Sequence, residues 1–135
     1  MTIRTANHGL AARTPGKAVN LVLWTLQVLV ALAFVAAGSG KLQGSADMIA
    51  LFEAVGVGQW FRYVTGLLEV VCAVLLVVPG KTAFGAVLLA CVMAGAVVAH
   101  LTVVPAPLTP ALVLFGLTAL IAWGRRSQLT GVLGS

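Results

Sequence analysis

The stretch AVNLVLWTLQVLVALAFVAAG, residues 18–38, carries no charged side chain from its first residue to its last. A helix needs roughly 17–25 predominantly apolar residues to cross the hydrocarbon core of a bilayer. The stretch is long enough, and it lacks the strict alternation of polar and apolar residues that marks a strand of a membrane barrel. It therefore predicts a transmembrane helix over residues 18–38.

Three further apolar stretches follow, over about residues 61–78, 82–104 and 108–123. The last is short for a span, although Pro110 falls in its first turn, where a helix accommodates proline. Of the 135 residues, 61% are hydrophobic and 8% are charged, far below the roughly 25% charged residues of soluble domains. We therefore expect an all-α membrane protein whose four transmembrane helices form a bundle, in one domain over residues 18–124.

The basic residues indicate the orientation of this domain. One side of the predicted bundle carries most of them: Arg4, Arg13, Lys17, Lys81, Arg125 and Arg126. The other side carries Lys41 and Arg62. Basic residues favour the cytoplasmic side of a membrane, so we expect a multi-pass protein of a bacterial inner membrane. Its basic N-terminus (1–17) and its tail (125–135) would both be cytoplasmic.

The net charge of +5 fits anchoring to anionic lipid, and it requires no nucleic acid as a partner. The bilayer is therefore the first partner that we expect. Small residues on the helix faces also leave room for self-association or for membrane-protein partners, without setting a subunit number.

The outward connection between the first two spans predicts a short amphipathic helix over about residues 45–55. Its apolar stripe consists of Met48, Ile49, Leu51, Phe52 and Val55, with Glu53 on another side. Such a helix lies on the membrane surface or folds into the mouth of the bundle. The sequence leaves both placements open.

Polar residues on three spans are expected at similar depths. At ~1.5 Å per residue, Glu69 lies roughly 10 Å below the outer face and His100 roughly 6 Å below it. Lys41 follows the outer end of the first span, on a stripe that Gln27 and Phe34 share at intervals of seven. We therefore expect one outward-opening pocket, lined by Gln27, Phe34, Lys41, Phe52, Gly66, Glu69 and His100, with Glu53 above it.

Glu69 has two readings. An unpaired charge at this depth costs about 2.5–3.5 kcal/mol on insertion scales, so the carboxylate should face the bundle and find a partner. Lys41 is the expected partner, because its long stem can follow the helix downward. The pair either locks the first span to the second, or Glu69 and His100 act as catalytic acid and base, with Lys41 orienting Glu69.

Other kinds of site lack their signatures. A histidine and a glutamate without further ligands do not complete a tetrahedral metal set, so we expect no metal. Nucleotide-binding, acyl-transfer and CxxC motifs are missing from the sequence. Cys72 and Cys91 fall near the midplane, where thiols are usually inert packing residues, although a redox pair stays open. No cofactor is evident from the sequence, which leaves the binding of a quinone open.

Two segments carry a family resemblance. AGSGKLQG follows the first span, and RYVTGLLEVV begins the second. With Phe52 and Gly56 between them, they resemble the DoxX-like family of small four-helix membrane proteins. The matching positions are Gly38, Lys41, Leu42, Phe52, Gly56, Gly66 and Glu69. The resemblance covers about residue 34 to the end of the second span.

What the resemblance implies is mixed. The family takes its name from a subunit associated with thiosulfate–quinone oxidation, and distant relatives act as chaperones of membrane proteins. The resemblance therefore favours an accessory or quinone-associated subunit of a membrane oxidoreductase system. Two alternatives remain. One is an intramembrane enzyme that isomerises or cyclises a lipophilic substrate, or opens its epoxide, by acid–base chemistry. The other is a membrane-protein chaperone or small transporter.

Overall fold

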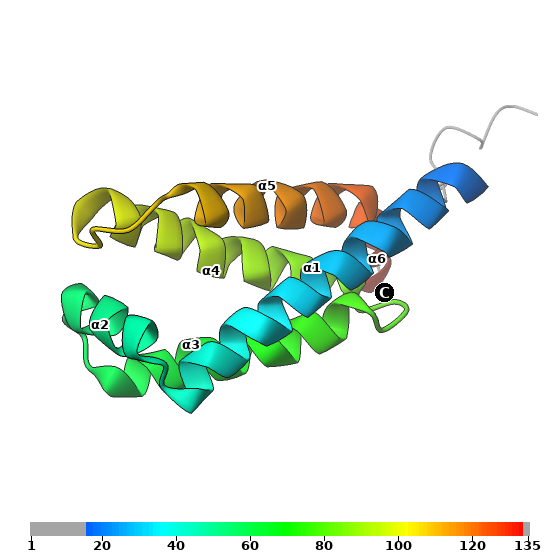
Figure 1. Ribbon diagram of the computed structural model, residues 1–135. Coiled ribbons are helices and arrows are strands. Elements are labelled where there is room, and N and C mark those ends of the chain that lie inside the picture. Colours follow the sequence, from blue (N-terminus) through cyan, green and yellow to red (C-terminus); the bar gives the residue numbers. More distant parts are fainter. Residues whose placement is uncertain (1–15, 134–135) are drawn as a thin grey trace, which may run out of the picture.

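The computed structural model describes residues 16–133, and within this range its regular elements are all helices (Figure 1). Residues 1–15, with Arg4 and Arg13 of the predicted basic N-terminus, lie outside the described range, as do residues 134–135 of the tail. The helices are α1 (Lys17–Gln43), α2 (Ala46–Val55), α3 (Gln59–Leu76), α4 (Thr82–Thr102), α5 (Thr109–Gly124) and α6 (Arg126–Leu133).

Three helices are long and apolar enough to cross a membrane: α1, α3 and α4. The fourth apolar helix, α5, has 16 residues. At ~1.5 Å per residue it reaches about 24 Å, less than the ~30 Å hydrocarbon core. The prediction of an all-helical membrane protein is therefore confirmed as three candidate spans with a shorter apolar helix, and a fourth full-length span is not confirmed.

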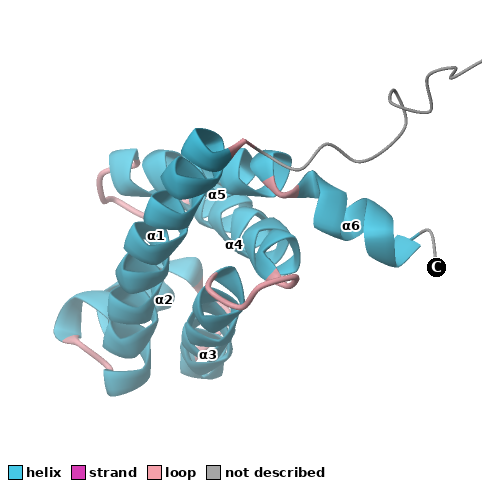
Figure 2. Ribbon diagram, turned by 90° about the vertical axis from the view of Figure 1, so that its right-hand side faces the viewer, coloured by secondary structure: helices cyan, strands magenta, loops and turns pink. Residues whose placement is uncertain are grey.

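The four long apolar helices pack side by side in the order α1, α3, α4 and α5. α1 packs against α3, α3 against α4 and α4 against α5, with a smaller contact between α5 and α1. Figure 1 shows α2 and the α4–α5 turn at one end, and the α3–α4 turn and α6 at the other. Figure 2 shows α6 projecting to the side of the helices. We call these the α2 end and the α6 end.

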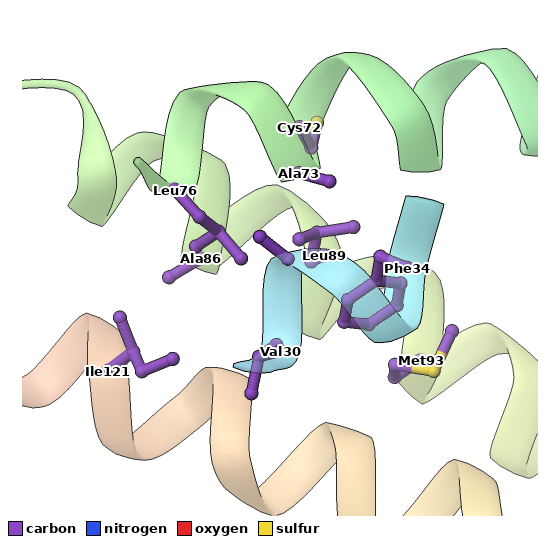
Figure 3. Close-up of a cluster of buried hydrophobic side chains, with 10 residues drawn as sticks. Val30, Phe34, Cys72, Ala73, Leu76, Ala86, Leu89, Met93 and Ile121 are labelled. Atoms are coloured by element: carbon purple, nitrogen blue, oxygen red, sulfur yellow. The ribbon is translucent and has the colours of Figure 1, made fainter. Parts of the chain in front are cut away.

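A cluster of buried apolar side chains occupies the interior between the two ends. Val30 and Phe34 of α1 meet Cys72 and Leu76 of α3, and Leu89 and Met93 of α4 complete the contact (Figure 3). Many leucines and valines face outward instead, among them Leu32 and Leu101. A helix that is apolar on all sides is typical of a membrane span, because both its protein-facing and its lipid-facing surfaces are dry.

α1 and α3 cross with their backbones in contact at two glycines. A Cβ added at Gly38 would lie 2.7 Å from the carbonyl oxygen of Gly66 and 2.7 Å from Cγ2 of Val70. A Cβ added at Gly66 would lie 2.9 Å from the carbonyl oxygen of Gly38. Real Cβ atoms do not approach other atoms so closely, so this crossing requires glycine on both helices. Small residues let membrane helices pack in this manner.

α1 ends later than its sequence indicates. The helix was expected to stop at residue 38, but it continues to Gln43 and ends at Gly44, whose φ of 73° suits glycine. The amides of Gly44 and Ser45 both donate to the carbonyl oxygen of Gly40, at 3.1 and 3.2 Å. Lys41 therefore lies in the last turn of α1 rather than in the connection after it.

Candidate functional site

Lys41 and Glu69 form an ion pair between α1 and α3. Nζ of Lys41 donates to Oε2 of Glu69 at 3.0 Å. The lysine side chain is 13% exposed and the glutamate side chain 1%. Residues three apart lie on the same face of a helix, so Lys41 follows Gly38 and Glu69 follows Gly66 on the faces that cross. The close backbone approach at the glycines therefore brings the two charges within reach of each other.

Arg62 extends this pair into a network. Its Nη1 donates to the carbonyl oxygen of Lys41 in the last turn of α1, and its Nε donates to Oε1 of Gln59 at 2.8 Å. Nε2 of Gln59 donates in turn to the carbonyl oxygen of Ile49 on α2, at 3.1 Å. A cation at the C-terminal end of a helix is favoured by the helix dipole. The network, which we call the α2-end network, thus joins α1, α2 and α3.

One oxygen of Glu69 is not used by this network. Oε1 is buried and has no hydrogen-bond partner among the described residues. A buried acceptor that stays unpaired costs about 1–3 kcal/mol. The carboxylate therefore keeps one acceptor position in the interior, next to the ion pair.

Gln27 belongs to a different network, at the α6 end. Its Nε2 donates to the carbonyl oxygen of Leu76 at 2.8 Å, and Nε of Arg125 donates to its Oε1 at 2.8 Å. Thr82 donates to the same Leu76 carbonyl at 3.0 Å. The expected grouping of Gln27 with Lys41 is therefore wrong. The two residues share a stripe of α1, but fourteen residues at ~1.5 Å each separate them by about 21 Å.

Arg125 is the centre of this α6-end network. Its Nη1 donates to Oδ1 of Asn20 at 2.8 Å, and its guanidinium lies 5.8 Å from the ring centre of Trp24. Burial lowers the pKa of this guanidinium, which lies just beyond α5, but an arginine keeps its charge in proteins. One side chain thereby ties the end of α5 to α1, and through Gln27 to the α3–α4 turn.

The other expected pocket residues have separate positions. Phe34 is fully buried in the apolar core, and Phe52 packs its ring edge against Phe61, at 5.9 Å between ring centres. Gly66 forms the α1–α3 crossing. Glu53 is exposed on α2, and no hydrogen bond or ion pair of its side chain occurs among the described residues.

His100 is half-buried on α4, and its Nδ1 lies 2.8 Å from the carbonyl oxygen of Ala96 on the same helix. Within residues 16–133, no hydrogen bond or ion pair joins it to Glu69 or Lys41. The structure thus brings Lys41 and Glu69 together without bonding His100 to either. It also offers no grouping of three His, Cys, Asp or Glu side chains for a metal within the described residues.

The cysteines are both free thiols. Cys72 is buried in the apolar core, whereas Cys91 is exposed on α4. Cys91 also lines a groove between α4 and α5, whereas Cys72 does not.

Sequence reasoning missed Gln59 and Arg62 as members of the site. Arg62 stands beside Trp60, Phe61 and Tyr63, a pattern typical of a membrane interface. The signal that identifies it is its spacing from Gly66 and Glu69, four and seven residues further along. That spacing places all three on one face of α3.

Comparison with known proteins gives one match. The model of the DoxX-like family matches residues 25–123. This range includes the ion pair, the α2-end network and Gln27, but it excludes Arg125, Asn20 and Trp24 of the α6-end network. The resemblance seen in the two glycine-containing segments is confirmed by this match. No curated protein and no solved structure matches the chain significantly.

Substitution of the ion pair should be asymmetric. We expect Lys41→Met to lower stability by about 2.5–3.5 kcal/mol, because it leaves a buried carboxylate unpaired. We expect Glu69→Leu to cost less, because Lys41 can reach the interface. The double variant should cost less than the sum of the two, by about 1–3 kcal/mol.

Unfolding of the full chain in detergent, followed by circular dichroism, measures these differences. Lys81→Met, in the exposed α3–α4 turn, is the matched control and should have little effect. If the double variant loses as much stability as the two single variants together, the ion pair does not couple the helices.

Proposed function

The chain belongs to the DoxX-like family, and we propose that it is an accessory subunit of a membrane oxidoreductase system, associated with quinone. The observation that carries this proposal is that the buried charged side chains are bonded within the protein. Lys41 pairs with Glu69, and Arg62 binds the last turn of α1 through the carbonyl oxygen of Lys41, as residues of a structural clamp do. An acid–base pair would need Glu69 and His100 to act on one substrate, and the imidazole instead contacts its own helix.

The outer surface supports an accessory role as well. Exposed leucines and valines cover α1, α3 and α4, so lipophilic molecules such as quinones and the spans of other subunits can contact the protein within the bilayer. An anchoring subunit requires only such surfaces and a rigid fold. The electrons would be carried by partner subunits.

One observation favours the enzyme as a second candidate. Oε1 of Glu69 is a buried acceptor without a partner among the described residues. It could accept a proton or a hydrogen bond from a hydroxyl group of a lipophilic substrate. In that case Lys41 would hold the carboxylate in place through Oε2.

Purification from native membranes separates these two functions. We expect the tagged full chain in mild detergent to retain stoichiometric oxidoreductase subunits and quinone, detected by mass spectrometry and by quinone-reductase activity. A folded Glu69→Gln protein should keep both the partners and the activity, because the carboxylate is structural. His100→Gln, at the other proposed catalytic residue, should likewise have no effect.

An intact complex that loses activity on Glu69→Gln would contradict the accessory role and support the enzyme. Purification of the chain without any redox subunit, together with unchanged quinone reduction in membranes lacking it, would also contradict the proposal.

We further propose that the α6 end faces the cytoplasm of a bacterial inner membrane. The support is the placement of Lys17, Lys81, Arg125 and Arg126 near this end, where basic residues are favoured. The opposite end would face outward, with Ser45 exposed at the start of α2.

Cysteine labelling tests this orientation. In a background with Cys72→Ala and Cys91→Ala, we expect Ser45→Cys to react with a membrane-impermeant maleimide in intact spheroplasts. Lys81→Cys, exposed in the α3–α4 turn, should react only after permeabilisation. The reverse pattern would overturn the assignment.

A further inference from the structure

An open apolar groove runs along the α6 end, away from the ion pair. It has a volume of about 470 Å³ and lies between α4 and α5, with α6 at its end. Alanines form much of its wall: Ala90 and Ala94 from α4, and Ala119 and Ala122 from α5. The groove exists because these side chains are too short to fill the space between the two helices.

The groove spans most of the depth of one lipid leaflet. Along α5 it extends from Phe115 to Trp123, eight residues or about 12 Å at ~1.5 Å per residue. One leaflet contributes about 15 Å to the ~30 Å hydrocarbon core. Trp123 marks the membrane interface, where tryptophan is enriched. An acyl chain in the groove would therefore lie parallel to the helices and end near the bilayer midplane.

A cation stands where the headgroup of such a lipid would be. Arg126 lines the groove, and its guanidinium lies 4.5 Å from the ring centre of Trp123. Its Nη1 donates to the carbonyl oxygen of Trp123 at 2.7 Å. The side chain is exposed, and within the described residues this carbonyl is its one hydrogen-bond acceptor. The planar guanidinium has further N–H groups that suit a phosphate.

The charge at this end favours an anionic lipid over a second copy of the chain. The three acidic residues of the whole sequence are Asp47, Glu53 and Glu69, on α2 and just past the middle of α3. Among the described residues, α4, α5, α6 and their connections therefore carry basic side chains without any acidic one. A second copy in the same orientation would bring its own cations to this place, whereas an anionic phospholipid would neutralise them.

We propose that the groove between α4 and α5 binds one acyl chain of an anionic phospholipid, with its phosphate on Arg126. Arg125 does not share this role, because its side chain is buried and does not line the groove. Its Nε and Nη1 bind Gln27 and Asn20, and its buried Nη2 has no partner among the described residues. The site is independent of the oxidoreductase role, since neither Lys41 nor Glu69 lines the groove. Bound lipid would fill the groove and hold α6 at the membrane surface.

Native mass spectrometry of the full chain, stripped of lipid in detergent and then titrated, tests the proposal. The probes are phosphatidylglycerol and phosphatidylcholine with the same acyl chains. We expect a single adduct that prefers phosphatidylglycerol. Arg126→Gln should weaken phosphatidylglycerol binding about fivefold, the expected effect of one basic residue at a membrane surface. Lys81→Gln also removes one positive charge, but outside the groove, and should change phosphatidylglycerol binding little.

The second part of the test fills the groove with larger side chains. We expect the double variant Ala94→Leu/Ala119→Leu to lose the adduct of both lipids, while Ala33→Leu, at an exposed position of α1, retains it. Equal losses for Arg126→Gln and Lys81→Gln, or an adduct that survives groove filling, would overturn the proposal. A dimer of the wild-type chain that becomes a monomer on groove filling would show that a second copy occupies the groove instead, and would overturn it too.

Discussion

The contact between the backbones of α1 and α3 at Gly38 and Gly66 is the constraint on which the site depends. Each glycine lies three residues before one member of the ion pair, on the same helix face. Their close approach sets the distance between Lys41 and Glu69, at 3.0 Å. A larger side chain at either position would separate the helices and with them the charges. The close backbone contact at the glycines therefore allows the ion pair to form. All four residues lie in the segments that carry the family resemblance.

The two polar networks stabilise opposite ends of the same helices. At the α2 end, Lys41, Glu69 and Arg62 tie α1 to α3 and, through Gln59, to α2. At the α6 end, Gln27 and Arg125 tie α1 and α5 to the α3–α4 turn. Between them, the contacts are apolar. Lipid tails are as apolar as leucine, so helices in a bilayer gain little from hydrophobic burial, and close packing and hydrogen bonds hold them together. Each network joins a polar residue from the interior of a helix, Glu69 or Gln27, to a basic residue near a helix end.

The sequence predicted the parts of this architecture that depend on composition and on helical period. The apolar runs located the helices, and the depth of Glu69 below the outer face identified Lys41 as its partner. Helical period alone misplaced Gln27, because a stripe of residues gives the face of a helix but not the position along it. Sequence also gave no signal for α6, whose RSQLTGVL segment has no long apolar run. The extension of α1 to Gln43 escaped prediction because the Gly-Ser-Gly segment after residue 37 resembles a helix end.

The function of the protein depends on whether the buried carboxylate of Glu69 does more than hold α1 and α3 together. Its pairing with Lys41 and the separate hydrogen bond of His100 favour a structural role, and its unpartnered oxygen is the feature on which a catalytic role would rely. The apolar groove between α4 and α5 is separate from this site, because neither Lys41 nor Glu69 lines it.

The stability of two alanine variants of α1 tests the central claim most directly. Gly38→Ala places a methyl group against the backbone of α3, and overpacking of this kind costs about 1–3 kcal/mol. Gly40→Ala lies two residues away in the same helix, where an added Cβ meets nothing within 4 Å. Alanine favours a helix over glycine by about 1 kcal/mol, so this variant should unfold in detergent at the wild-type temperature or above it. A clearly lower unfolding temperature for Gly38→Ala alone is the predicted result, and equal unfolding temperatures for the two variants would contradict the account.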